Sequence, residues 1–133
     1  MKIIMLGTVT VLALVGCGGG TGPCVARAGS FKVHSSTASG NCGDVSDLVI
    51  TVNPNDKSVP AGCVDNGSSE SADLCSITAA YKCSTANGGT ITINSVGKWN
   101  TEGTSATATE GIIVSTPSGA CNGTYDLSYT KIQ

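Results

Sequence analysis

The last stretch of the chain alternates between apolar and polar residues, and this period of two restricts the fold more than any other feature of the sequence. Between positions 121 and 132 every second residue belongs to the set Gly123, Tyr125, Leu127 and Tyr129, and polar residues separate them. Side chains on a β-strand point alternately to opposite faces of the sheet, so this pattern predicts a strand with one buried face.

The same pattern returns in shorter stretches that end at Gly, Asn, Asp, Ser or Pro. In the first of them Phe31 and Val33 face one way, and Lys32 and His34 face the other. Leu74 to Ser84 fits either a short helix or a strand, and the alternation favours the strand. The expected strands are 29–36, 46–52, 74–84, 90–96 (extended or bent by 97–100), 105–115 and 121–132.

These stretches predict one all-β domain over residues 24–133. Short turns between successive strands favour an antiparallel meander, and a meander buries its apolar face by closing into a barrel or stacking as a sandwich. We expect about six to eight strands by this reasoning. Residues 57–73 show no sustained period and are predicted to form a long loop pinned by cysteines. The motifs at 29–33 and 123–127 loosely resemble strands of small lipocalin-like barrels.

The chain has seven cysteines, and an odd number leaves one thiol unpaired in an exported protein. Cys17 follows directly after an apolar N-terminal stretch. If Cys17 is set aside, an even six remain that can form up to three disulfides in an oxidising periplasm or cell exterior. These six are Cys24, Cys42, Cys63, Cys75, Cys83 and Cys121.

Spacing alone does not determine how the six cysteines pair. Cys42 and Cys121 are the preferred pair, because they lie where the first predicted strand ends and the last begins. A local bond among Cys63, Cys75 and Cys83 is also expected. No two of the six form a Cys-x-x-Cys motif, and the chain has one histidine, so no metal site is expected.

The N-terminus carries the signature of an exported chain. Lys2 precedes an apolar stretch, Ile3 to Val15, which is signal-peptide anatomy and shorter than the roughly 20 residues of a spanning helix. The residues Leu14, Val15, Gly16 and Cys17 resemble the lipobox of bacterial lipoproteins at all four positions. The resemblance implies a diacylglyceryl group on the Cys17 sulfur, cleavage after Gly16 by the lipoprotein signal peptidase, and a further acyl chain such as palmitate on the new amino terminus.

The lipobox divides the chain into a signal peptide (1–16), a lipidated cysteine with a Gly-rich tether (17–23) and the β-domain (24–133). Acyl chains on Cys17 would attach the protein to a membrane. Gly18 stands where an Asp would be the familiar inner-membrane retention signal, so the resemblance favours the outer membrane.

The sequence offers little for catalysis. Hydrolytic triads need a base, and the only histidine, His34, is expected to be exposed or simply hydrogen bonded. Carboxylate pairs such as Glu102 and Glu110 are expected to be solvated, since they lie in or beside predicted turns. With a net charge of −2 and no basic patch, nucleic acid is not an expected partner. We expect a protein that is not an enzyme and has no cofactor.

Three functions agree with these features. The first is a noncatalytic, membrane-anchored envelope lipoprotein with a structural or protein-contact role. The second is a barrel that binds a small apolar ligand, which would make Trp99 and Tyr125 the ligand wall, whereas core packing is the default expectation for Trp99. The third is a disulfide-framed inhibitor or defence factor that presents the 57–73 loop. The first is preferred, because no catalytic constellation is present and the anchor motif is complete.

Overall fold

The computed structural model describes residues 24–25, 27–53, 58–71 and 75–133, and within them all regular structure is β. The predicted lipobox, Leu14 to Cys17, and the Gly-rich tether lie outside the described residues. The strands are β1 (Gly29–Gly40), β2 (Leu48–Val52), β3 (Cys63–Asp65), β4 (Ser69–Glu70), β5 (Ser76–Ser84), β6 (Thr90–Trp99), β7 (Ser105–Thr116) and β8 (Gly119–Lys131).

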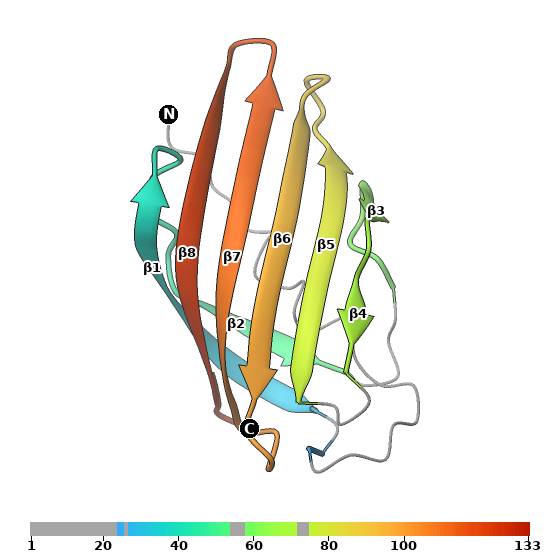
Figure 1. Ribbon diagram of the computed structural model, residues 1–133, viewed down its shortest axis with the longest axis vertical. Coiled ribbons are helices and arrows are strands. Elements are labelled where there is room, and N and C mark those ends of the chain that lie inside the picture. The colour runs from blue at the N-terminus through green and yellow to red at the C-terminus, as the bar shows by residue number, and fades with distance from the viewer. Residues whose placement is uncertain (1–23, 26, 54–57, 72–74) are drawn as a thin grey trace.

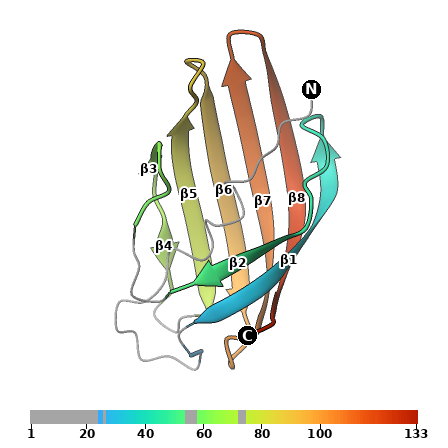
Figure 2. The same ribbon diagram turned by 180° about the vertical axis from the view of Figure 1, so that it is seen from behind.

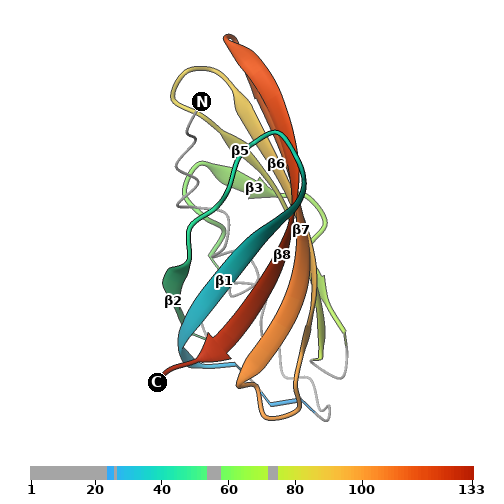
Figure 3. The ribbon, with the colours of Figure 1, turned by 90° about the vertical axis from the view of Figure 1, so that its left-hand side faces the viewer.

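The eight strands form one antiparallel sheet in the order β2-β1-β8-β7-β6-β5-β3, with β4 also paired to β5. The long strands β5 to β8 stand side by side, and β1 and β2 cross behind them (Figures 1 and 2). Seen from the side, the sheet curls into a half-barrel with β2 facing its concave side (Figure 3). The all-β antiparallel prediction is therefore confirmed, and β5 to β8 form the expected meander.

The first strand pairs with the last. Phe31 lies opposite Lys131 and Gly40 lies opposite Gly123, with a shift of register between Thr37 and Ser39. A disulfide joins Cys42 to Cys121 just beyond this pairing, which is the pair expected from the strand ends. The other two disulfides are Cys24–Cys75 and Cys63–Cys83.

Alternation along each strand places the apolar residues on the concave face. Phe31 and Val33 are buried there, and Lys32 and His34 point outward, as predicted. Trp99 is 5% exposed and packs edge-on against Phe31 with 5.2 Å between ring centroids, so its core role is confirmed. The core also includes Ile50, Val52, Ile77, Ile112, Val114, Tyr125, Leu127 and Tyr129.

Two predictions for the middle of the chain have different outcomes. The strand interpretation of the ambiguous stretch is confirmed by β5, which begins at Ser76. The expectation of a loop without regular structure at 57–73 is wrong in part, because β3 and β4 lie within it and pair with β5. Strands of three and two residues are too short to show a period of two.

Gly123 is the position in β8 where a side chain would disturb the core most directly. The ring of Tyr125 lies over it, so that a Cβ would stand 2.7 Å from the tyrosine oxygen. That hydroxyl donates a 2.8 Å hydrogen bond to the carbonyl of Gly43, which holds the ring in place. The contact fastens the turn after β1 to the beginning of β8.

We expect Gly123→Ala to lower the free energy of unfolding by about 1–3 kcal/mol, because the added methyl must displace the Tyr125 ring. Gly111→Ala on β7 is the matched control, since a Cβ there meets nothing closer than 3.8 Å. Its stability should be unchanged or raised by up to about 1 kcal/mol. Urea denaturation measures both, and equal losses in the two variants would contradict the packing argument.

Candidate functional site

A groove of about 500 Å³ lies on the outer face of the sheet, across β1, β8, β7 and β6. Its walls are outward side chains, and its floor includes Gly97, Ala108 and Leu127. The concave core lies on the other side of the same strands, so this groove is separate from the interior.

The strand register explains why these side chains come together. One row across four strands consists of His34, Ser128, Thr107 and Lys98, each opposite the next. The neighbouring row consists of Ser36, Asp126, Thr109 and Val96. Adjacent strands are about 4.8 Å apart, so each row spans about 14 Å. The site is therefore a strip of mostly hydroxyl side chains. Lys98 lies at one end, His34 lies at the other end, and the carboxylate of Asp126 lies between them.

Asp47, which comes just before β2, holds His34 at the edge of the groove. The Nδ1 atom of His34 lies 2.7 Å from Asp47 Oδ1, and Lys32 Nζ lies 3.8 Å from Asp47 Oδ2. The hydrogen bond from His34 is the main cause that lowers the pKa of Asp47, and the positive charge of Lys32 contributes. All three side chains are exposed, so this cluster orients His34 more than it stabilises the fold.

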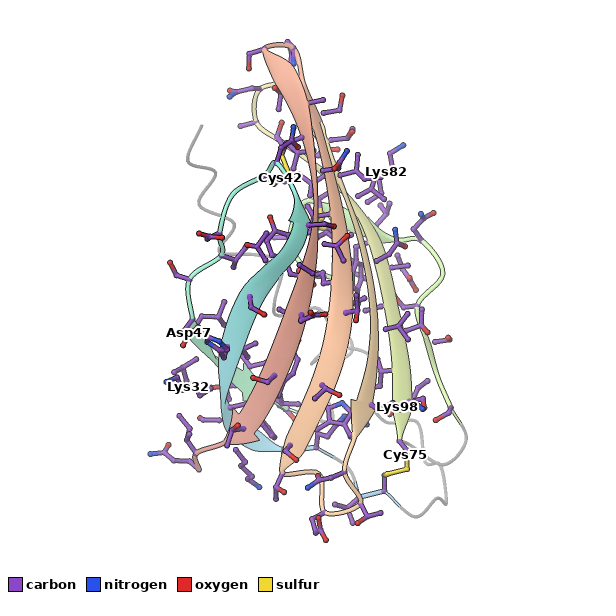
Figure 4. All side chains as sticks on the ribbon, turned by 60° about the vertical axis from the view of Figure 1, so that its left-hand side comes forward. Lys32, Cys42, Asp47, Cys75, Lys82 and Lys98 are labelled. Carbon is purple, nitrogen blue, oxygen red and sulfur yellow. A yellow bond between two sulfur atoms is a disulfide. The ribbon has the colours of Figure 1, made fainter. Side chains whose placement is uncertain are left out.

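Lys98 stands on the opposite side of the groove, with β8 and β7 between it and Lys32 (Figure 4). Neither Lys98 nor Asp126 has an ion pair or hydrogen bond within the described part of the chain. The groove therefore presents a positive charge on Lys98 and a negative charge on Asp126. Neither charge is neutralised by an ion pair within the described part of the chain.

The groove does not assemble a hydrolytic triad. Within the described residues the side chain of His34 bonds to Asp47, and no serine hydroxyl lies within hydrogen-bond distance of its ring. The prediction that His34 is exposed or hydrogen bonded is confirmed. Among the described residues no group of three or more His, Cys, Asp or Glu side chains has the arrangement of a metal site.

The predicted ligand wall of Trp99 and Tyr125 lies on the concave face. Its two residues belong to different rows of the sheet, Trp99 to the row of Ala106 and Tyr125 to the row of Glu110. Trp99 contacts Tyr129, with 5.7 Å between ring centroids, and the guanidinium of Arg27 lies 5.3 Å above its ring. Tyr125 is turned over Gly123 instead. Both side chains belong to the buried core.

Glu110 is the residue that sequence reasoning misplaced. It lies in the middle of β7, is 2% exposed, and accepts a 2.7 Å hydrogen bond from the hydroxyl of Ser95. The expectation that it is solvated beside a turn is therefore wrong. Glu110 is an even number of residues away from the inward-facing Ala106, Ala108, Ile112 and Val114. In an alternating strand this spacing places its side chain on the inward face as well.

Burial raises the pKa of Glu110 to about 7, and the hydrogen bond from Ser95 opposes this shift. The charge of Glu110 in turn raises the pKa of Tyr125 and of Tyr129, although burial is the larger cause for both tyrosines. Below neutral pH the interior thus contains a carboxyl group that is mostly protonated and uncharged.

Comparison with protein-family models, with curated proteins and with solved structures finds no match for this chain. In the part of the chain that the structure describes there is also no helix with the length and apolarity that crossing a bilayer requires.

We expect the stability of the wild-type protein to fall as the pH rises from about 4.5 to about 7. In this window the unfolded Glu110 loses its proton and the folded one keeps it, which favours the unfolded state. The pKa difference corresponds to about 3 kcal/mol. Glu110→Gln keeps an acceptor for Ser95 and removes the titration, so the wild-type and variant curves should separate across this window.

Thermal or urea unfolding of both proteins at several pH values measures this separation. The difference between the two curves cancels the contribution of the other titrating groups. A constant difference from pH 4 to pH 8 would contradict the assignment of Glu110 as a buried acid.

Proposed function

We propose that this protein is a noncatalytic lipoprotein of the bacterial envelope, anchored through Cys17, whose β-domain contacts a partner protein through the outer-face groove. The observation that carries the contact role is the assembly of eight outward side chains from two adjacent rows around one hollow. Unpaired Lys98 and Asp126 supply charges of both signs, which suits a polar protein surface better than a purely apolar ligand.

The disulfides support the anchor by elimination. The three bonds use Cys24, Cys75, Cys42, Cys121, Cys63 and Cys83. The seventh cysteine, Cys17, is left over, and it is the one that the lipobox resemblance assigns to lipid. A thiol that carries lipid does not remain free to scramble these bonds.

The place where the described domain begins supports a contact close to the membrane. Cys24, where the domain begins, is bonded to Cys75, and the amide of Val25 donates to the carbonyl of Thr101 in the β6–β7 turn. Lys98 and Thr107 lie near the same turn. Six Gly-rich residues span only about 13 Å, so the groove would stay near the surface of the outer membrane.

The anchor predicts that Cys17→Ser abolishes lipidation and signal-peptidase cleavage. The wild-type protein should enter the detergent phase in its processed size, whereas the variant should keep the size of the precursor. Gly18→Ser is the matched control, because it leaves the lipobox residues intact and should be processed normally. Processing and partitioning of Cys17→Ser identical to the wild type would refute the lipoprotein assignment.

The contact role predicts a discrete crosslink from the groove in intact cells. A photoreactive amino acid at Thr107 should give one main adduct, which Lys98→Glu should reduce at least fivefold. Asn94, exposed on the same outer face of β6 but outside the groove, is the control position and should give none. Equal labelling from both positions, or none from Thr107, would contradict a groove contact.

The inhibitor alternative makes a different prediction in the same experiment. Val64 on β3 is 62% exposed, and the Cys63–Cys83 bond fixes its strand beside β5. A photoreactive group at Val64 should then be the one that labels a partner. Labelling from Val64 in the absence of labelling from Thr107 would replace the groove proposal with the inhibitor function.

A further inference from the structure

The concave face of the half-barrel contains buried polar atoms that the described residues leave without a hydrogen-bond partner. The indole Nε1 of Trp99 and the hydroxyl of Tyr129 are buried, and neither has a hydrogen-bond partner among the described residues. The two side chains belong to one row, because both Trp99 and Tyr129 lie opposite Ala106 on β7. Leaving a buried donor unpaired is costly, so two of them on neighbouring rings indicate an acceptor that comes from outside the described residues.

The buried acid Glu110 lies on the same face, two rows further along the sheet. Its carboxyl bonds to Ser95, and its charge influences the titration of Tyr129, which places the two groups within electrostatic reach. Neither Glu110 nor Ser95 completes the hydrogen bonding of Trp99 or Tyr129.

The row between these two polar sets is narrow only on the two central strands, where it contains Gly97 and Ala108, and it is flanked by Ile77 on β5 and Leu127 on β8. Gly97 lies opposite Ala108, with Trp99 and Ala106 in the row before and Ser95 and Glu110 in the row after. Glycine and alanine project little from the sheet, so on β6 and β7 no large side chain stands between the Trp99 ring and the Glu110 carboxyl. The sheet is also not closed, since the terminal strands of its order, β2 and β3, do not pair with each other.

We propose that the concave face binds a small molecule with an apolar body and a carboxylate, the body against Phe31 and Trp99 and the carboxylate oxygens accepting from Trp99 Nε1 and the Tyr129 hydroxyl. An N–H and an O–H donor suit a carboxylate, which only accepts hydrogen bonds. The aromatic rings supply the apolar wall that small-molecule sites usually have. This site is on the opposite face from the outer groove and does not depend on the groove's function.

The experiment uses Trp99, the only tryptophan of the chain, as its reporter. The full chain in lipid nanodiscs at pH 6 is titrated with 4-nitrobenzoate, an aromatic carboxylate whose nitro group quenches tryptophan fluorescence. Saturable quenching is expected. The matched probe 4-nitrotoluene has the same ring without the carboxylate, and it should bind at least tenfold more weakly.

Tyr129→Phe removes one donor and keeps the ring. It should weaken 4-nitrobenzoate binding at least fivefold while the melting temperature stays the same or rises, because an unsatisfied hydroxyl has been removed. A role of Tyr129 in stability alone would lower the melting temperature and leave affinity unchanged. Lys98→Ala, on the outer face beside Trp99 in sequence, should leave binding unaltered even if it abolishes the groove crosslink.

Quenching that rises linearly without saturation, or equal affinity for the two probes, would overturn the proposal and leave ordered water as the partner of these atoms. Unchanged affinity in Tyr129→Phe would also overturn it. If Tyr129→Phe does not fold, Phe31→Leu tests the apolar wall instead: the proposal expects weaker 4-nitrobenzoate binding because the ring that contacts the ligand body next to Trp99 is lost, and unchanged binding counts against it.

Discussion

The pairing of the first strand with the last is the interaction on which the rest of this structure depends. β1 and β8 are far apart in sequence, and their ladder runs from Phe31 opposite Lys131 to Gly40 opposite Gly123. The Cys42–Cys121 bond and the hydrogen bond from Tyr125 to Gly43 fasten the end of this ladder. A disulfide that closes so long a loop removes much of the freedom of the unfolded chain.

Both candidate sites follow from that ladder. β1 supplies His34 and Ser36, one side of the outer groove, and without it the rows of hydroxyls on β7 and β8 would end at an open edge. β1 also carries β2 around the concave side, where Ile50 and Val52 join the core. Phe31, from the same strand, packs against Trp99. A single pairing thus separates a polar outer face from an interior that retains a buried acid and unpaired donors.

Much of the fold could be predicted from local pattern, because alternation reports directly which face of a strand is buried. It identified β1, β2 and β5 to β8 and placed Phe31 and Val33 correctly. Register could not be predicted, since it depends on turn geometry and on pairing between distant strands. For this reason the meeting of His34, Ser128, Thr107 and Lys98 in one row became visible only in the structure. The His34–Asp47 contact depends in the same way on the path of the chain before β2.

Glu110 shows a different limit of prediction from the sequence. Its position in the alternation of β7 was readable, but the ordinary preference of glutamate for solvent outweighed it, and Gly111 interrupted the pattern. Residues that break the usual rule for their type are often functional, because the fold keeps them at an energetic cost. Glu110, Trp99 Nε1 and the Tyr129 hydroxyl together make the concave face the least expected part of the molecule.

The proposed function depends on a division of the seven cysteines between a lipid anchor on Cys17, which we propose, and the three disulfides of the domain. Mass spectrometry of the intact protein extracted from membranes, without reduction, tests this division directly. The account predicts a chain that begins at Cys17, carries diacylglyceryl and acyl groups on that residue, and has no free thiol. A chain that begins elsewhere, an unmodified Cys17, or a free thiol among the other six would contradict it.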